Sequence, residues 1–219
     1  MNIVIGVPLR YREKLPKHIK QLGYRVVIAH NTKDEAALGD DTNEHVTTKV
    51  VLCRERVRRK FLEEASADCL FFLDSDVKVP RSLISEFEKQ LTEQGLDVIS
   101  HVYAQRTNMN LYLKIGVGGR ERTQRIPIGY YDSATGKYMN HGKIILGLGC
   151  TLIRRRVLEG FSFSFIPDKG DDTPFWEYVV ANGFSAVILD KFNVKHEGIP
   201  NMPTGKEHRT GKGLGLCPY

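Results

Sequence analysis

The sequence predicts an α/β protein whose central sheet is mostly parallel. A strand, a short helix and a second strand follow one another within residues 1–29, and this β-α-β order is typical of the start of a parallel sheet. The buried run CLFFL, at residues 69–73, lies between a helical pattern at residues 54–65 and a helix that Pro80 opens. Both observations favour strands that alternate with helices.

Composition limits the class of protein. The 219 residues are enough for one domain with a full core, and 41% of them are hydrophobic and 26% charged. A net charge of +6 and a pI near 9.1 favour an anionic partner, which could be a phosphorylated ligand, a nucleic acid or an acidic membrane surface. The four cysteines form no CxxC pair, which argues against a zinc knuckle and against a disulfide framework.

The same data bear on location. The apolar run at residues 2–7 has no basic segment before it, so it reads as a strand and not as a signal peptide. No window of the sequence approaches 18 apolar residues. Together with the scattered cysteines, these observations lead us to expect a cytoplasmic protein, with peripheral membrane contact left possible.

The first half reads as strands and helices in alternation. Strands are expected at residues 2–7, 24–29, 46–52, 69–73 and 97–102. Helices are expected at residues 10–23, at residues 54–65 and from Pro80 to Gly95. In the last of these, Leu83, Ile84, Phe87 and Leu91 fall on one face. The segment at residues 30–43 is polar.

The second half is less regular. The stretch YYDSATGKY, within residues 130–138, predicts a hairpin, and GLGCTLIRRRVLEGF predicts a strand followed by a short basic helix. Thr173 and Pro174 supply an N-cap and first-turn pair for another helix, which Gly183 ends. A strand follows at residues 185–189, and the Gly/Pro-rich tail at residues 198–219 is expected to form a loop.

Two carboxylates follow the buried run at residues 69–73. In an extended segment, residues two apart point to the same side, so Asp74 and Asp76 are expected to converge just past the end of the strand. Open α/β sheets bind their ligands at that edge. Converging carboxylates need a counter-charge, and Mg²⁺ or Mn²⁺ bound to a diphosphate suits oxygen ligands. The alternative is one Asp that caps a turn and one solvated Asp.

Seven segments in order resemble the GT-A glycosyltransferases, particularly their family-2-like group. They are GVPLR, VIAHNT, RERVRRKFLEEA, LDSD, GLGCTLIRRRVLEGF, GDDTPFWEYVVANGF and VKHEG. The resemblance spans almost the whole chain. It implies a three-layer α/β/α domain with a Rossmann-like, mostly parallel sheet. Residues 1–103 would bind the donor, residues 104–197 would bind the acceptor and hold the catalytic residues, and residues 198–219 would be a basic tail or a lid.

The resemblance implies a donor site in the first half. The residues matched to nucleotide-sugar binding are Pro8, Leu9, Arg10, Asn31, Arg54, Arg58, Asp74, Ser75 and Asp76. Asn31 stands where the family often has an Asp, which leaves the base open between UDP and GDP donors. On the basic helix at residues 54–65, Arg58 fits the family's spacing better than Arg54. Val57 and Phe61 face the core, so only one or two of the cations of this helix can face the site.

The resemblance also implies a base and a metal site. Asp172, the second acid of the pair Asp171–Asp172, would take the proton from the acceptor hydroxyl in an inverting transfer. Asp171 is the alternative base. The structural alternative is that these aspartates only cap the helix that follows. The metal ligands would be Asp74, Asp76 and His196, with Mn²⁺ or Mg²⁺ as the cofactor, and Asp76 is the likelier direct ligand of the two carboxylates. His196 could equally be a packing residue. Trp176 could line the acceptor site.

The resemblance thus implies a hexosyltransferase-type enzyme, metal-dependent and inverting. Its acceptor would be a glycan, a lipid-linked glycan or a protein. A nucleotidyltransferase is the weaker enzyme reading, because GVPLRYREK is not a glycine-rich phosphate loop. A basic nucleic-acid-binding protein is the other alternative. It would need aromatic residues interleaved with a basic stripe, and the acidic pairs would fit poorly in a polyanion groove, so we expect no nucleic acid partner.

Overall fold

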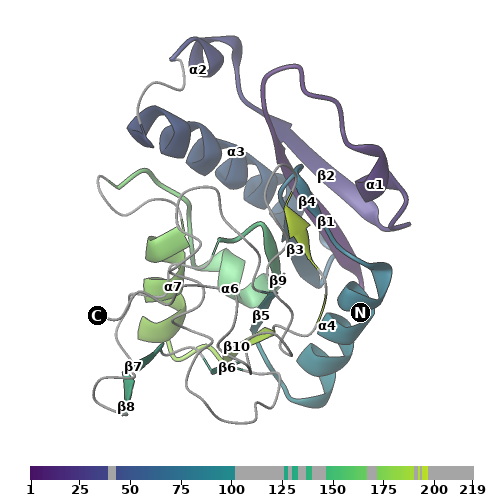
Figure 1. The fold of residues 1–219 in the computed structure, drawn as a ribbon, viewed down its shortest axis with the longest axis vertical. Coiled ribbons are helices and arrows are strands. Elements are labelled where there is room, and N and C mark those ends of the chain that lie inside the picture. The colour runs from purple at the N-terminus through teal and green to yellow at the C-terminus, as the bar shows by residue number, and fades with distance from the viewer. Residues whose placement is uncertain are drawn as a thin grey trace, which may run out of the picture.

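A computed structural model shows how the elements are arranged (Figure 1). The structure describes residues 1–38, 43–101, 126–127, 130–132, 137–139, 147–166, 172–189, 192 and 194–196. Three of the predicted features, the tail at residues 198–219, Asp171 and most of residues 102–146, lie outside these ranges.

The main sheet joins seven of the described strands in the order β2-β1-β3-β9-β5-β10-β6. In that order, their bounds are Arg25–His30, Ile3–Leu9, Cys69–Leu73, Cys150–Arg154, Val98–His101, Ala186–Leu189 and Ile126–Pro127. Strand β9 runs antiparallel between β3 and β5, and β6 runs antiparallel to β10; the remaining pairs are parallel. The mostly parallel sheet that the sequence predicts is confirmed.

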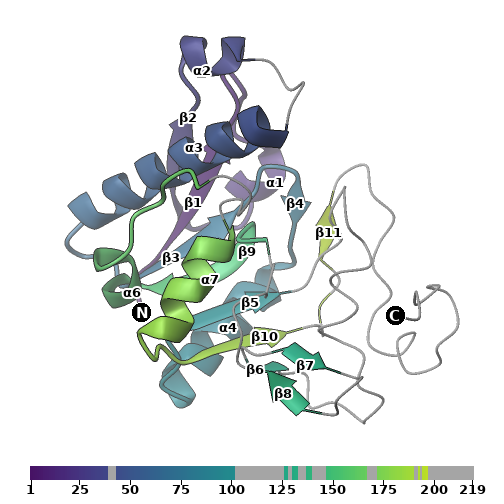
Figure 2. The ribbon, with the colours of Figure 1, turned by 90° about the vertical axis from the view of Figure 1, so that its left-hand side faces the viewer.

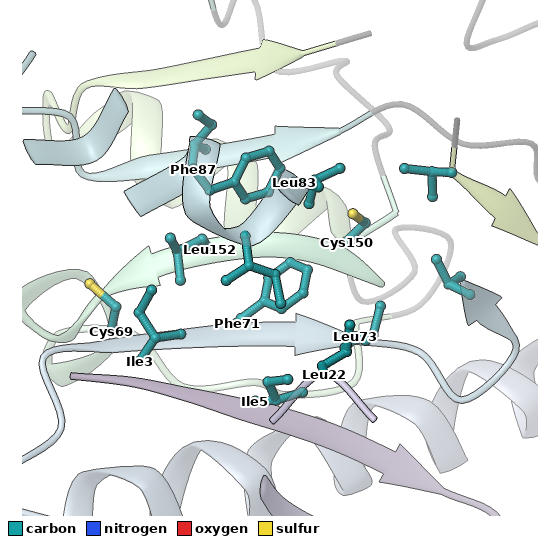
Figure 3. Packing of buried hydrophobic residues seen from close by; sticks show 14 of the residues in the cluster. Ile3, Ile5, Leu22, Cys69, Phe71, Leu73, Leu83, Phe87, Cys150 and Leu152 are labelled. Atoms are coloured by element: carbon teal, nitrogen blue, oxygen red, sulfur yellow. The ribbon is translucent and has the colours of Figure 1, made fainter. Parts of the chain in front are cut away.

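The sheet lies between two layers of helices, and its central strands β3 and β5 are buried on both faces. Along β3, Leu70 and Phe72 pack under one layer, while Phe71 and Leu73 pack under the other. Helices α3, α6 and α7 cover the first face, onto which Figure 2 looks. Helices α1 and α4 cover the second, where Phe71 meets Phe87 edge to face at 5.9 Å between ring centroids (Figure 3). The predicted three-layer α/β/α arrangement follows.

One predicted strand is wrong. Residues 46–52 belong to the long helix α3 (Asn43–Glu63), which continues through the predicted helix at residues 54–65. The β-branched run around Val50 and Val51 suggested a strand. No Gly or Pro interrupts the segment, however, and Val51, Val57 and Phe61 are fully buried at helical spacing against the sheet.

The first predicted helix is much shorter than residues 10–23. Helix α1 spans Lys17–Lys20 only, because Pro16 precedes it and residues 10–13 form a turn. In this turn, the Glu13 amide donates to the Arg10 carbonyl at 3.0 Å, and Arg12 adopts a left-handed φ of 60°. Gly23, which the sequence predicts as the end of this segment, adopts a left-handed φ of 77°.

A short helix, α2 (Lys33–Ala37), lies in the polar segment at residues 30–43. Thr32 and Glu35 form a reciprocal capping box, a signal that the TKDE stretch carries. Glu35 also pairs with Arg56 of α3, and the hydrogen bond from Arg56 lowers the pKa of Glu35 to about 2. This ion pair fastens α2 to α3 at the end of β2.

The remaining predicted elements occupy nearly their expected places. Helix α4 (Arg81–Glu93) buries the four predicted apolar residues. Helix α6 (Arg155–Glu159) follows β9, and α7 (Asp172–Ala181) begins one residue before the predicted Thr173 cap. The hairpin is present as β7 (Tyr130–Asp132) paired with β8 (Lys137–Met139). Within the described ranges, no helix is both long and apolar enough to cross a membrane.

Three cysteines are buried and unpaired. Burial raises the pKa of Cys53 to about 11 and that of Cys69 to about 12, and it also raises the pKa of Cys150. Since a protonated, buried thiol is a poor nucleophile, these side chains act as small core residues.

Candidate functional site

The end of β3 is a turn and not an extended segment. The Val77 amide donates to the Asp74 carbonyl at 3.0 Å, so residues 74–77 close a β-turn with Ser75 and Asp76 at its centre. The Asp74 amide donates to the Gly149 carbonyl at 3.0 Å, which anchors the turn to the entrance of β9. The extended backbone on which the predicted convergence of Asp74 and Asp76 rests is therefore replaced by a turn.

Arg54 binds the first of these carboxylates. Its Nη2 donates to both oxygens of Asp74, at 3.1 and 3.2 Å, and its Nη1 donates to Oδ1 of Asp172 at 2.7 Å. The Arg54 side chain is only 3% exposed, so the guanidinium lies between two acids that are 98 residues apart in the sequence. Planar guanidinium groups suit such two-pronged contacts. The structure thus brings together the residue that follows β3, one residue of α3 and one of α7.

Asp172 lies in the first turn of α7, where the helix dipole favours a negative charge. The Leu148 amide donates to its Oδ1 at 3.0 Å, so both hydrogen bonds recorded for Asp172 within the described residues go to this one oxygen. Burial raises the pKa of Asp172, and the charge of Arg54 and the Leu148 amide only partly oppose that increase. A buried carboxylate with a raised pKa is a better proton acceptor than a solvated one.

Asp76 pairs with His196 across the second sheet. Strand β4 (Val77–Lys78) and strand β11 (Lys195–His196) lie side by side (Figure 2). They are antiparallel, with His196 opposite Val77. This register places Nε2 of His196 3.0 Å from Oδ2 of Asp76. The strand pairing explains how a residue 120 positions later reaches the turn.

The chain before β11 is held by a buried histidine that sequence reasoning missed. His101, at the end of β5, is 2% exposed, and its Nε2 accepts the amide proton of Phe192 at 3.0 Å. Because Nε2 accepts, the ring proton lies on Nδ1 when the side chain is neutral. Only its position at a strand end could have indicated this role.

The pair of Asp76 and His196 fits a divalent cation. Adjacent ligands of an octahedral ion bound at about 2.1 Å lie about 3 Å apart, and the two atoms show that spacing. An imidazole nitrogen and a carboxylate oxygen are both accepted by Mn²⁺. In the part of the chain that the structure describes, however, no three acidic, His or Cys side chains gather as a metal site, because Asp74 is turned to Arg54. Asp76 and His196 would supply two protein ligands, and water or a bound phosphate would complete the shell.

The residues matched to the nucleotide base lie at the ends of β1 and β2. Leu9 is 2% exposed and packs in the core, Pro8 is half-buried, and Arg10 is exposed in the turn that follows. Asn31 is 8% exposed, and its Nδ2 donates to the Lys49 carbonyl at 2.9 Å and to Glu35 at 3.4 Å. The Asn31 amide group is thus oriented by α2 and α3.

Two predicted residues lie elsewhere. The guanidinium of Arg58 is held by Glu55 and donates to the Leu158 carbonyl at 2.9 Å, so Arg54 and not Arg58 is the arginine of α3 that reaches Asp74. Trp176 is 1% exposed and packs beside Phe175 in the core, which leaves no open ring face for an acceptor. Asp171 lies outside the described residues.

Known structures resemble this chain, although no protein-family model and no curated protein matches it. The crystal structure of A197 from STIV aligns with 90% of this chain and 85% of its own, at a TM-score of 0.55 and 21% identity. The structure of S. aureus TarS 1-349 in complex with UDP-GlcNAc aligns with 89% of this chain, at a TM-score of 0.52 and 14% identity. The chain spans 58% of that TarS segment.

Identities this low establish the fold alone. The layers, the sheet order and the alignment over most of the chain agree with one another. The protein therefore has the GT-A fold of glycosyltransferases, as the sequence predicts.

Proposed function

We propose that the protein is a metal-dependent glycosyltransferase that moves a hexosyl group from a UDP- or GDP-sugar to an acceptor hydroxyl, with inversion. The observation that carries the proposal is the contact of one guanidinium with Asp74, at the ligand-binding edge of the sheet, and with Asp172 on α7. This contact joins Asp74, the carboxylate on the donor side, to Asp172, the candidate base. The fold supports the proposal, and TarS, which shares it, has been solved with UDP-GlcNAc.

Asp172 would be the general base. Its Oδ1 is occupied by Arg54 and Leu148, so Oδ2 is the oxygen that would take the acceptor's proton. The side chain is 13% exposed, which leaves a route for that hydroxyl. As the hydroxyl oxygen attacks the anomeric carbon, the proton moves to Oδ2 and the bond to the nucleotide diphosphate breaks on the opposite side of the sugar.

Asp76 and His196 would hold the metal ion. When bound, Mn²⁺ or Mg²⁺ would act as a Lewis acid that stabilises the charge on the departing diphosphate. Asp74 would keep Arg54 as its partner and bind the nucleotide side of the donor. The 3.0 Å separation of the two ligand atoms supports this division between Asp74 and Asp76.

The other elements of the proposal follow from the sequence. Pro8, Arg10 and Asn31 would border the nucleotide base, and Asp171 would be the alternative base. The acceptor would be a glycan, a lipid-linked glycan or a protein. The enzyme would work in the cytoplasm, with its basic surface allowing peripheral contact with a membrane.

Calorimetric titration with UDP, GDP and their sugars tests the proposal, first with Mn²⁺ and then with EDTA. We expect micromolar binding of one nucleotide that requires the metal, is lost in Asp76→Ala and is kept in Asp172→Asn. Sugar transfer by Asp172→Asn should fall by ~100-fold or more, because general base catalysis is worth that much. Asp34→Asn removes an exposed acid from the first turn of α2 and is the matched control. If no nucleotide binds with metal present, the proposal is wrong.

A further inference from the structure

We propose that Arg54 is a positioning residue that holds the base Asp172 and the donor-side carboxylate Asp74 as one unit. The inference rests on the proposed function and deepens it. It assigns to Arg54 the task of fixing the base relative to the donor, and not only that of attracting a phosphate.

The geometry distinguishes Arg54 from the other arginines of α3. Arg56 pairs with Glu35, while Arg58 and Arg59 share Glu55 at 2.9 and 2.8 Å. Each of these cations thus has a glutamate that fastens helices or loops. Among the described residues, Arg54 instead binds two aspartates, one directly after β3 and one in α7.

The fork of the guanidinium sets where each acid lies. One terminal nitrogen binds Asp172 and the other binds Asp74, so the two carboxylates are kept on adjacent corners of one rigid plane. Lysine has one nitrogen on a flexible stem and does not impose that arrangement. Because Nη1 of Arg54 donates to Oδ1 of Asp172, the rotation of the Asp172 carboxylate is fixed, and Oδ2 is left for the acceptor hydroxyl.

The position of Arg54 is itself set by the core. Val57 and Phe61, which follow on the same side of α3, are fully buried against the sheet. Among the described residues, the buried guanidinium of Arg54 thus lies between the half-buried carboxylates of Asp74 and Asp172. Removing the guanidinium would leave two acids without this shared counter-charge, while removing one acid would leave the guanidinium with less compensation.

The first test separates positioning from donor binding. Arg54→Lys keeps the positive charge, and we expect kcat for sugar transfer to fall ~100-fold, the loss typical of a misplaced reacting group, while the Kd of the nucleotide changes less than ~3-fold. The matched control is Arg59→Lys, an arginine of the same helix that is 71% exposed, and it should keep the wild-type kcat. An unchanged kcat in Arg54→Lys, or an equal loss in kcat and nucleotide affinity, would overturn the inference.

The second test needs no substrate. The Tm change that Asp172→Asn causes in the otherwise wild-type protein, where the buried guanidinium loses a partner, should be at least ~3 °C more negative than the change it causes in a background without that guanidinium. In an Arg54→Met background the same change should raise the Tm, since it relieves repulsion between two acids. An Arg54→Lys background serves the same comparison if Arg54→Met does not fold, with an expected Tm loss smaller than in the wild type.

The two tests together distinguish the inference from the proposed function. If Asp172→Asn changes the Tm by the same amount and in the same direction in every background, Arg54 does not link the two acids. That conclusion would hold whether or not the protein transfers sugars. A background-dependent Tm effect in a protein that binds no nucleotide would confirm the link, and would overturn both its positioning role and the proposed function.

Discussion

Gly6 is the point at which the packing of the sheet and the geometry of the site can be perturbed together. A Cβ atom added at this residue of β1 would lie 2.5 Å from Cγ1 of Val57 and 2.8 Å from Cδ1 of Leu70. Carbon atoms in contact prefer about 3.5–4.0 Å. Gly6→Ala therefore requires β1 and α3 to move apart by about 1 Å, because Val57 and Leu70 are both fully buried.

The expected cost is that of an overpacked core. Inserting one methyl group into a filled interior costs about 1–3 kcal/mol, which lowers the Tm of a chain of this size by about 2–12 °C. Arg54 lies one helical turn before Val57, so the displacement of α3 also moves the guanidinium relative to Asp74. Sugar transfer should consequently fall more than the loss of folded protein explains.

Thermal unfolding and transfer assays of four proteins test this reasoning: the wild type, Gly6→Ala, Val57→Ala and the double variant. Val57→Ala removes the atom that the new methyl group meets, so the double variant should be more stable than the sum of the single changes predicts. Gly95→Ala is the matched control, because its φ of 63° makes it costly although no atom lies within 4 Å. Its cost should add to that of Val57→Ala. Strict additivity for Gly6→Ala and Val57→Ala would refute the proposed close approach.

Three further predictions concern ionisable groups. The folded pKa of Glu35, about 2, lies below the ordinary value of 4.5, so its ion pair stabilises the protein above pH 4.5 and this contribution disappears as the pH falls toward 2. Glu35→Gln should therefore lower the free energy of unfolding in urea by about 1–3 kcal/mol at pH 7 and have little effect near pH 2; equal effects at both pH values would contradict it. In a Cys217→Ser background, the thiols of Cys53 and Cys69 should resist Ellman's reagent at pH 8 until urea unfolds the chain, and rapid labelling of the folded protein would disprove their burial. His196→Ala should weaken Mn²⁺ binding, measured by electron paramagnetic resonance, by ~10-fold or more, whereas an unchanged affinity would remove this residue from the metal site.

Most elements of the fold could be predicted because their signals are local. The buried run of β3 and the apolar face of α4 each follow from the period of their own residues. The strand predicted at residues 46–52 failed because β-branched residues fit either a strand or a buried helix face. Packing against the sheet decides between the two, and a short window does not contain that information.

The site was predictable in its residue types and less so in its contacts. Asp74, Asp76 and His196 were identified from motifs, and the structure pairs the last two. The choice between Arg54 and Arg58 depended on the rotation of α3, which the spacing of the two residues on one helix face does not reveal. Trp176 followed the acidic pair in sequence, but the helix turns its ring into the core.

The sequence by itself determined the alternation of strands and helices, the sheet's mostly parallel character and the acids at its ligand-binding edge. Hydrophobic period, turn residues and caps act within a few residues, so a single chain displays them. Only the tertiary structure decided that Arg54 reaches both Asp74 and Asp172, and that the pairing of β4 with β11 brings His196 to Asp76. Those contacts join residues 20 to 120 positions apart, and the stacking of layers that creates them is a property of the whole folded chain.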